Sequence, residues 1–397
     1  MNNIIYQKII LLSYYYLMKT KKQRYNKDKK TKKYSMKSVK KKKEKIALRI
    51  CNRLNKTIKQ NIITIGIVTA PYIVGKQTYI TSYMASSYKK WLESAGALIV
   101  PIQFDLPSEV IHGLLKQING ICLIGGGIVN TKTHDHNQFI KYKNTMETIF
   151  NYVIYSNKNN NYYPMWCTCM SFELIILYIK NLKFNSQSEI TDNYLSKSGK
   201  YGESKLHWTN EPSKIKKMFT KSEIKCMSKY PCLFQAHQYS HNINSKIIKT
   251  FKDIANIPAV GIASDNSKYI NIFELKDYPI YGVQFHPEKP PFEYENSGKR
   301  VPKTQIAITL SFKLAKFFIK ECKKNHNIWI GGKNYYDFTI NDYNLFNKNI
   351  SRRLTRLTNS TLTTNQIGDA GIYLFGKEIF NKDTNIISNP WTPINKL

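Results

Sequence analysis

Two cysteines separated by one residue, Cys167 and Cys169, stand in the stretch PMWCTCMSFE. An apolar run precedes them and a helix-like run follows, so Cys169 would lie in a sharp strand-to-helix turn. Such a turn strains the backbone at the positive end of the helix, which favours an exposed sulfur with a lowered thiol pKa. Small residues are needed two positions before and after the nucleophile. Cys167 and Ser171 satisfy this around Cys169, whereas Met165 is too large for Cys167 to be the nucleophile. Alternatively, both cysteines are ordinary buried residues at a strand end.

A histidine that could serve as the base lies in the stretch YGVQFHPEKPP. His286 follows an apolar strand, and Pro287 stops that strand at once, so the imidazole would project from the strand end. It could take a proton from Cys169 and return it to a leaving amine. Glu288 could orient the other ring nitrogen, as the third member of a triad does.

Three glycines, Gly125, Gly126 and Gly127, end the apolar run GICLIGGG. Glycine lets the backbone approach a ligand closely because no Cβ intervenes, so Gly125 and Gly127 are candidates for contact with a substrate. The amides of Gly126 and Met170 could hold a developing oxyanion. A lone glycine triplet after a strand is more often an ordinary loop.

Strands and helices alternate through the first half of the chain. Continuous apolar runs predict buried strands at 61–71, 97–105, 120–127 and 162–167. Helical spacing predicts helices at 79–97, 110–118, 139–156, from Met170 onward and at 311–324. Residues 261–275 and 279–287 are expected to form the two strands of a hairpin. The alternation indicates an α/β fold with an open, doubly wound, mostly parallel sheet and flanking helices. Ligands bind such sheets at the carboxyl ends of the strands.

The chain carries a formal net charge of +35, concentrated in part between Lys19 and Lys45, where 15 Lys and Arg face only Asp28 and Glu44. A run of this kind is expected to be disordered. Charge alone does not exclude nucleic acid, but zinc-finger spacing and an aromatic–basic RNA-binding signature are both missing, so we expect no nucleic-acid partner. The apolar patch from Ile9 to Met18 is either a signal or anchor sequence or a disordered start. Membrane contact is therefore expected only through this patch.

The seven cysteines are odd in number and irregularly spaced, which argues against a disulfide framework. The pair Cys167 and Cys169 has no second pair at ligand spacing, so we expect no metal site.

The order of these motifs resembles the class I glutamine amidotransferase superfamily, which has a flavodoxin-like fold and a Cys-His-Glu site. Longer phrases are similar to the γ-glutamyl hydrolase family, a family of cysteine peptidases. These phrases are YITSYMASSYKKWLESAGALIVPI, INGICLIGGG, YYPMWCTCMSFE and QFHPEKPPFEY with the helix SFKLAKFF. The resemblance covers about residues 61–325. It divides the chain into a basic segment at 1–60, a catalytic domain at 61–325 and a C-terminal extension at 326–397.

The resemblance implies that Cys169 is the nucleophile, His286 the general base and Glu288 the residue that supports the histidine. His237, in FQAHQYSHN, matches a histidine of the family's active-site cleft; the alternative is a surface loop histidine. The family's elbow is usually Gly-Thr-Cys-Leu-Gly, and Cys167 and Ser171 replace both glycines here. A Cβ at a strained turn costs about 1–3 kcal/mol, which could shift the sulfur.

The expected function is a thiol hydrolase that cleaves γ-glutamyl bonds of folate poly-γ-glutamates through a thioester. The resemblance implies no metal or organic cofactor, allows a homodimer, and indicates a vacuolar, lysosomal or secreted protein. Two alternatives stay open. One is the glutaminase component of an amidotransferase, although the chain shows no second catalytic domain. The other is a catalytically inactive binding homologue, which the altered elbow would explain.

Overall fold

The computed structural model describes residues 62–71, 80–127, 136–296, 298–330, 340, 345–346 and 372–376. All of them lie within the unit Ile62–Leu397. The basic run and the apolar patch expected near the N-terminus lie outside the described residues. Within those residues, no helix is both long enough and apolar enough to cross a membrane.

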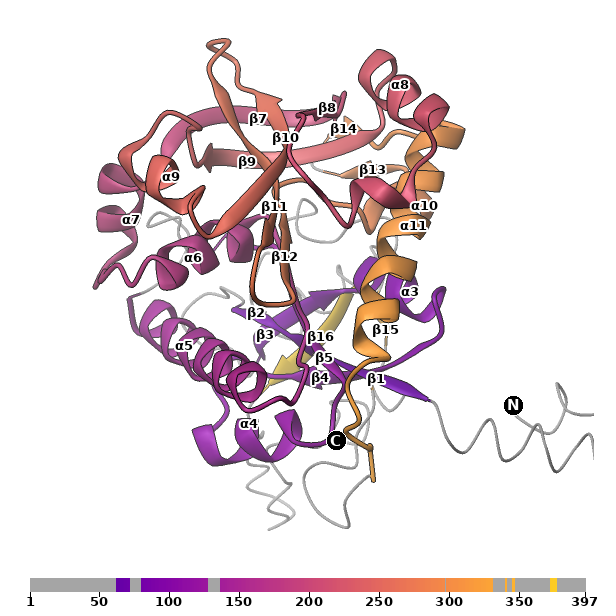
Figure 1. Cartoon of the computed structure of the whole chain (residues 1–397). Helices are drawn as coiled ribbons and strands as arrows, with labels where there is room; N and C mark the ends of the chain where they lie inside the picture. The colour runs from indigo at the N-terminus through magenta and orange to yellow at the C-terminus, as the bar shows by residue number, and fades with distance from the viewer. Residues whose placement is uncertain are drawn as a thin grey trace, which may run out of the picture. The chain divides into compact units, whose positions relative to one another are not determined.

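The central sheet is built around five parallel strands. They are β1 (Ile63–Val68), β4 (Ala97–Ile102), β5 (Gly120–Leu123), β6 (Met165–Thr168) and β12 (Ile280–Val283). Their spatial order, β4-β1-β5-β6-β12, is the flavodoxin-like order 2-1-3-4-5. Three antiparallel strands extend the sheet beyond β12 (Figure 1), namely β11 (Lys268–Leu275), β10 (Ala255–Ile262) and β8 (His207–Trp208). The predicted fold class is confirmed.

Helices cover both faces of this sheet, and each face has its own hydrophobic cluster (Figure 1). One face packs against α4 (Ser108–Leu115), α5 (His136–Lys158), α6 (Met170–Ile179), α7 (Gln187–Asn193) and α9 (Lys246–Phe251). The other packs against α3 (Ser86–Glu93), α8 (Lys221–Lys229) and α11 (Gln305–Cys322). Because both faces are covered, the strand ITIGIV is buried at every position. That explains its continuous apolar sequence.

A separate two-stranded ribbon pairs β7 (Ser196–Ser204) with β9 (Leu233–Ser240), antiparallel. It lies in the polar region between the predicted helices. The remaining short elements are the 3-10 helix η1 (Lys216–Met218), α10 (Lys289–Phe292), β13 (Glu295–Asn296) and β14 (Lys299–Arg300).

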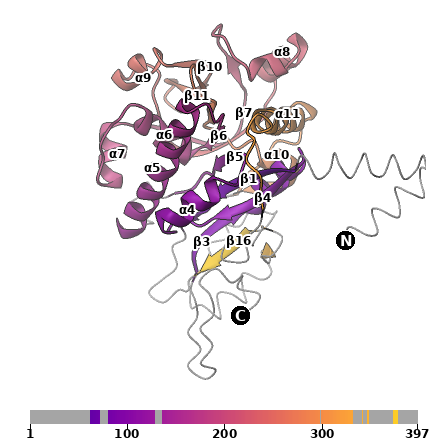
Figure 2. The same cartoon turned by 60° about the horizontal axis from the view of Figure 1, so that its bottom comes forward.

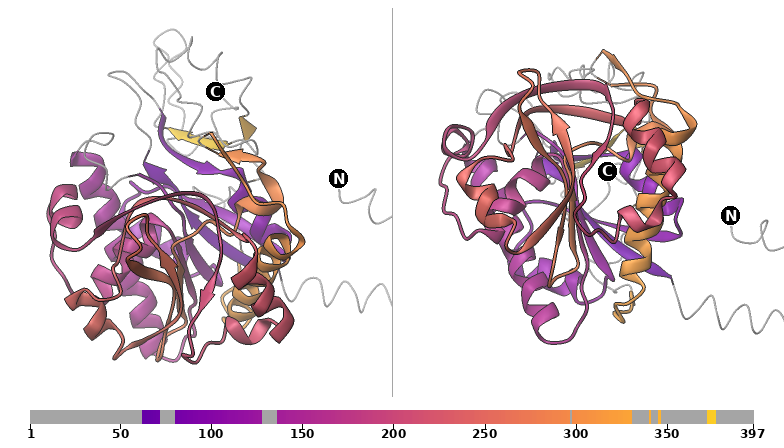
Figure 3. Two further views of the ribbon diagram at one scale, coloured as in Figure 1. Left: turned by 90° about the horizontal axis from the view of Figure 1, so that it is seen from above. Right: turned by 45° about the horizontal axis from the view of Figure 1, so that its top comes forward.

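The helix expected at 79–97 is wrong in its first half. Residues Ile80–Ala85 form strand β3, and only Ser86–Glu93 are helical. Strand β3 lies between β2 (Ala70–Pro71) and β16 (Ile372–Gly376), and β15 (Leu345–Phe346) completes this four-stranded sheet (Figure 2, Figure 3). Its main partner, β16, comes from the far end of the chain, so no local pattern could reveal the pairing.

The hairpin prediction is partly wrong. Strands β11 and β12 do pair antiparallel as expected. However, the stretch 261–275 is not one strand, because it holds the end of β10, a turn and β11. Asn266 in this turn has φ of 64°, a left-handed conformation that asparagine tolerates.

Strand β16 contributes core side chains, which gives a test of its role. Phe375 is 1% exposed and belongs to the same hydrophobic cluster as Tyr88 and Trp91. We predict that Phe375→Ala lowers the free energy of unfolding by about 3–5 kcal/mol, measured by denaturant unfolding. The matched control is Ile330→Ala, at a side chain that is 78% exposed, which should change stability by less than about 0.5 kcal/mol. Equal stability of both variants would show that β16 is not part of the core.

Candidate active site

Cys169 occupies the junction between β6, which ends at Thr168, and α6, which begins at Met170. Its backbone has φ of 54° and ψ of −113°. A side chain in this region costs on the order of 1–3 kcal/mol, and such strain clusters at functional sites. The other described non-glycine residues with positive φ are all asparagines. Cys169 is therefore exceptional, and its backbone is that of a nucleophile elbow.

The two residues that replace glycine in the elbow do not carry the strain. Neither Cys167 nor Ser171 has a positive φ. The Ser171 hydroxyl accepts a hydrogen bond from the Thr168 amide at 2.9 Å and lies 2.8 Å from the Leu123 carbonyl, to which it donates. Ser171 thus ties the turn to β5. The expected strain from a Cβ at these two positions is wrong, because the left-handed residue is Cys169 itself.

The expectation of an exposed sulfur with a lowered thiol pKa is also wrong. Cys169 is only 4% exposed. Burial raises the pKa of the Cys169 thiol well above its ordinary value, and the nearby Glu173 carboxyl adds to this. The Met170 amide, which donates a hydrogen bond to the sulfur, lowers the pKa but does not compensate. The resting sulfur is therefore a protonated thiol, and any attack by it requires a base.

Strand β9 accepts hydrogen bonds from both Cys169 and His286. The Cys169 thiol donates to the Ala236 carbonyl with a sulfur–oxygen distance of 3.7 Å. The His286 amide donates to the Phe234 carbonyl at 2.9 Å. Carbonyls two residues apart point to the same edge of a strand. One edge of β9 therefore aligns Cys169 with His286, which follows strand β12.

His286 is paired with Glu288. Its Nδ1 lies 2.8 Å from Oε1 of Glu288, and the two side chains are 9% and 0% exposed. Burial would raise the pKa of Glu288, but the attraction and hydrogen bond of His286, with help from Lys289, hold it below its ordinary value. A carboxylate at Nδ1 keeps the proton on that nitrogen. Nε2 is left as the basic nitrogen, which is the arrangement of a general base.

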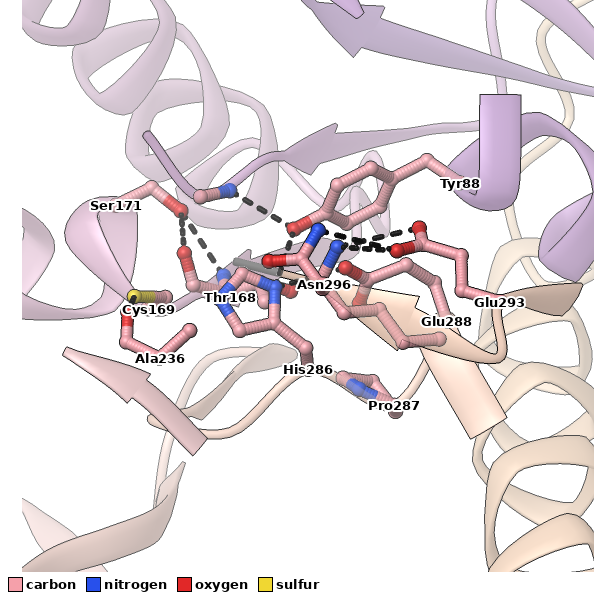
Figure 4. Close-up of polar contacts among 12 residues, drawn as sticks. Tyr88, Thr168, Cys169, Ser171, Ala236, His286, Pro287, Glu288, Glu293 and Asn296 are labelled. Atoms are coloured by element: carbon pink, nitrogen blue, oxygen red, sulfur yellow. Dashed lines mark hydrogen bonds and ion pairs between the residues drawn. The ribbon is translucent and has the colours of Figure 1, made fainter. Parts of the chain in front are cut away.

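Gly125 is the point where these groups converge. A Cβ built on Gly125 would lie 2.7 Å from Cε1 of His286, 3.2 Å from Cβ of Cys169 and 3.3 Å from the Tyr88 hydroxyl. The Gly125 amide donates to that hydroxyl at 2.9 Å, and the same hydroxyl lies 3.4 Å from Nδ1 of His286. Figure 4 shows Tyr88, His286 and Glu288 grouped beside Cys169. Glycine is required here by space, because any side chain would displace the imidazole.

Gly126 lies next to the candidate oxyanion partner Met170. A Cβ on Gly126 would be 3.2 Å from both Cε of Met170 and Cβ of Ala70. Within the described residues, the Gly126 amide makes no hydrogen bond. The Gly125 amide, in contrast, donates to the Tyr88 hydroxyl. Gly127 is the last residue described before the gap at 128–135 and is partly exposed.

His237 is buried in β9 and is not a surface loop residue, so that alternative is wrong. Its Nε2 lies 3.0 Å from Oε1 of Gln235 and its Nδ1 lies 2.8 Å from the Ser198 hydroxyl. Burial lowers the pKa of His237 to about 3. The ring is therefore neutral, and its Nδ1 also lies 3.1 Å from the Tyr239 carbonyl. It immediately follows Ala236, whose carbonyl holds the Cys169 thiol.

Two features of the site were missed from the sequence. The first is Tyr88, which bridges Gly125 and His286. The second is the buried ion pair of Lys289 and Glu293 at 3.0 Å. Burial alone would lower the pKa of Lys289, but the carboxylates of Glu293 and Glu288 raise it. The sequence HPEK places Lys289 directly after Glu288, but it does not indicate that Glu293 is the ion-pair partner of Lys289.

Glu173 lies one helical turn after Cys169 and is also buried. Its Oε1 accepts from the Gln284 side chain at 2.8 Å, and its backbone carbonyl accepts from Nε2 of His241 at 2.8 Å. Burial raises the pKa of Glu173 to about 8. A mostly neutral carboxyl near neutral pH limits its repulsion of a thiolate at Cys169.

The fold is a flavodoxin-like, doubly wound sheet, and the relatives of this chain are cysteine-type hydrolases. Residues 64–288 match the Peptidase C26 family, and the chain belongs to this family. γ-Glutamyl hydrolase B of Dictyostelium discoideum is 30% identical over 308 residues, covering 75% of this chain and 81% of that protein. γ-Glutamyl hydrolase of Homo sapiens is 30% identical over 252 residues, covering 63% of this chain and 74% of its own.

γ-Glutamyl hydrolase 1 of Arabidopsis thaliana is 26% identical over 268 residues, covering 66% of this chain and 72% of its own. Among solved structures, one chain of PurLQS from Thermotoga maritima has 14% identity and a TM-score of 0.37, covering 66% of this chain and 98% of its own. The assignment of the fold rests on the strand order described above.

The hydrogen bonds of Ser171 lead to a prediction about a position where the family usually has glycine. We predict that Ser171→Gly destabilises the protein by about 1–3 kcal/mol, because the Thr168 amide and the Leu123 carbonyl lose a buried partner. Denaturant unfolding measures this. Ser171→Ala, which removes only the hydroxyl, should lose a similar amount. A glycine variant as stable as the unmodified protein would show that Ser171 is merely tolerated.

Proposed function

We propose that this protein hydrolyses γ-glutamyl amide bonds, with folate poly-γ-glutamates as its substrates. The observation that carries the proposal is the hydrogen bond between His286 and Glu288, formed where Gly125 brings the imidazole close to Cys169. The names of the relatives support γ-glutamyl as the bond that is cleaved. The folate part of the substrate rests on the resemblance of the sequence motifs alone.

The proposed reaction begins with a proton transfer. Nε2 of His286 takes the thiol proton while the Cys169 sulfur leaves the Ala236 carbonyl and attacks the γ-carbonyl carbon. Because the thiol pKa is raised by burial, the proton leaves during the attack and not beforehand. The imidazolium that forms is stabilised by the Glu288 carboxylate at Nδ1.

The carbonyl oxygen becomes an oxyanion when the carbon–sulfur bond forms. We assign its stabilisation to the backbone amides of Gly126 and Met170, which follow the carboxyl ends of the neighbouring strands β5 and β6. The Met170 amide forms a hydrogen bond with the resting sulfur, so it is already positioned to donate to the oxyanion as that charge develops.

Collapse of the tetrahedral intermediate breaks the carbon–nitrogen bond. Nε2–H of His286 protonates the departing nitrogen, and a thioester on Cys169 remains. Water then attacks the thioester with His286 again as base, which releases the γ-carboxylate and restores the thiol. Every step uses side chains and amides of this chain.

The surroundings of the site are assigned on the same basis. We propose that the substrate contacts His237, Gly125 and Gly127. His237 directly follows Ala236, whose carbonyl accepts a hydrogen bond from the Cys169 thiol. Residues 61–325 are the proposed catalytic unit, to which β16 of the segment 326–397 adds a strand. The elbow geometry supports an active enzyme over an inactive binding homologue, because the left-handed Cys169 and its hydrogen bonds are kept.

The test is product release from a folate pentaglutamate by the purified chain. We predict that Cys169→Ala loses at least about a thousandfold in kcat, the scale on which removal of a nucleophile acts. The matched control is Cys167→Ala, a fully buried neighbour on the same turn, which should keep activity within a few fold. Circular dichroism confirms that each variant is folded. Cleavage by Cys169→Ala, or loss only with Cys167→Ala, would overturn the assignment.

A further inference from the structure

We infer that Tyr201 is a specificity-determining residue whose hydroxyl donates a hydrogen bond to an α-carboxylate of the glutamyl chain bound at Cys169. This inference rests on the proposed function, because it names a contact to that substrate. Tyr201 lies in β7, in the polar region that carries none of the motifs discussed above.

The register of the ribbon brings Tyr201 to the site. Tyr201 is directly opposite Ala236 in the antiparallel pair of β7 and β9. Ala236 is the residue whose carbonyl accepts the Cys169 thiol. Directly opposite residues project their side chains from the same face and lie about 4.5–5.5 Å apart. The Tyr201 and Ala236 side chains share one face of the ribbon, and the small Ala236 methyl leaves room on that face for the Tyr201 ring.

The exposure of Tyr201 leaves it open to a ligand. Its side chain is 44% exposed, whereas the neighbouring Cys169 is 4% exposed. A single exposed aromatic is ordinary on a protein surface. Its pairing with the residue that binds the thiol distinguishes this one from the other exposed tyrosines, such as Tyr155 on α5 and Tyr230.

The hydroxyl of Tyr201 is suited to act as a donor. Partial burial raises its pKa, and the proximity of Cys169 and Glu173 raises it further, so the phenol keeps its proton. A hydrogen bond with the Gln238 side chain lowers the pKa without outweighing the burial. A protonated phenol can donate a hydrogen bond to a ligand.

The ligand chemistry that fits is a carboxylate. A γ-linked glutamate chain carries one free α-carboxylate per residue, and those next to the scissile bond must pass close to Cys169. Lys200 precedes Tyr201 and, within the described residues, has no ion-pair partner. Its charge adds to the attraction of an acidic chain to this end of β7.

The experiment is a cycle of two changes, one in the enzyme and one in the substrate. The enzyme change is Tyr201→Phe. The substrate change replaces the α-carboxylate by hydrogen in a γ-glutamyl oligomer, in one analogue on the acyl side of the scissile bond and in another on the leaving side. We expect Tyr201→Phe to raise KM for the full substrate about tenfold with little change in kcat, as for loss of a hydrogen bond to a charged group.

For one of the two analogues, the same variant should cause no further loss, because the acceptor is already gone. Tyr155→Phe, which removes the hydroxyl of a tyrosine that is 67% exposed on α5, is the matched control and should leave KM unchanged. An unchanged KM in Tyr201→Phe, or an equal loss with the full substrate and both analogues, would overturn the inference. No cleavage of any substrate by the unmodified enzyme would instead contradict the proposed function.

Discussion

The left-handed backbone of Cys169 is the constraint on which the site depends. A side chain at this φ and ψ is unfavourable, so the surrounding structure must hold it in place. The Cys169 amide donates to the Val283 carbonyl of β12 at 2.9 Å, and the Ser171 hydroxyl joins the turn to β5. Helix α6, which follows at once, is buried along most of its length. The central strands and the helix thus fix the turn from three sides, and the sulfur is set at the carboxyl edge of the sheet.

The burial that fixes the turn also determines how the thiol can react. A sulfur in this position is dry and close to Glu173, so its pKa rises and it stays protonated. In the proposed mechanism the thiol therefore depends on His286 as its base, and the Glu288 carboxylate at Nδ1 determines which ring nitrogen carries the proton. Lys289 and Glu293 sit behind this pair as a buried salt bridge. The Lys289 charge helps to keep the Glu288 carboxyl ionised, which ties the proposed chemistry to the position of α10.

The sequence predicts the parts of the fold that follow from short-range pattern. The buried run ITIGIV and the apolar runs before the glycines and Cys167 predict a parallel sheet, and the spacing of Cys169, Ser171, His286 and Glu288 indicates their roles. Interactions between distant segments leave no such pattern. The local spacing in strand β3 predicts a helix, because its partner β16 is at the other end of the chain. The Phe234 and Ala236 carbonyls and the Tyr88 hydroxyl contact the site only because the fold brings them there, so no sequence motif marks them. The raised pKa of the Cys169 thiol follows from its burial, which cannot be read from the sequence.

The central claim is that Cys169 forms a covalent acyl intermediate, and trapping that intermediate tests it most directly. The unmodified enzyme, mixed with a folate pentaglutamate and quenched in acid during turnover, would be digested and the stretch PMWCTCMSFE analysed by fragmentation mass spectrometry. The account predicts a substrate-derived acyl group on Cys169, labile to hydroxylamine as a thioester is, with Cys167 unmodified. Acylation of Cys167, or turnover with no acylated cysteine under conditions that trap the thioester of a known cysteine peptidase, would contradict it.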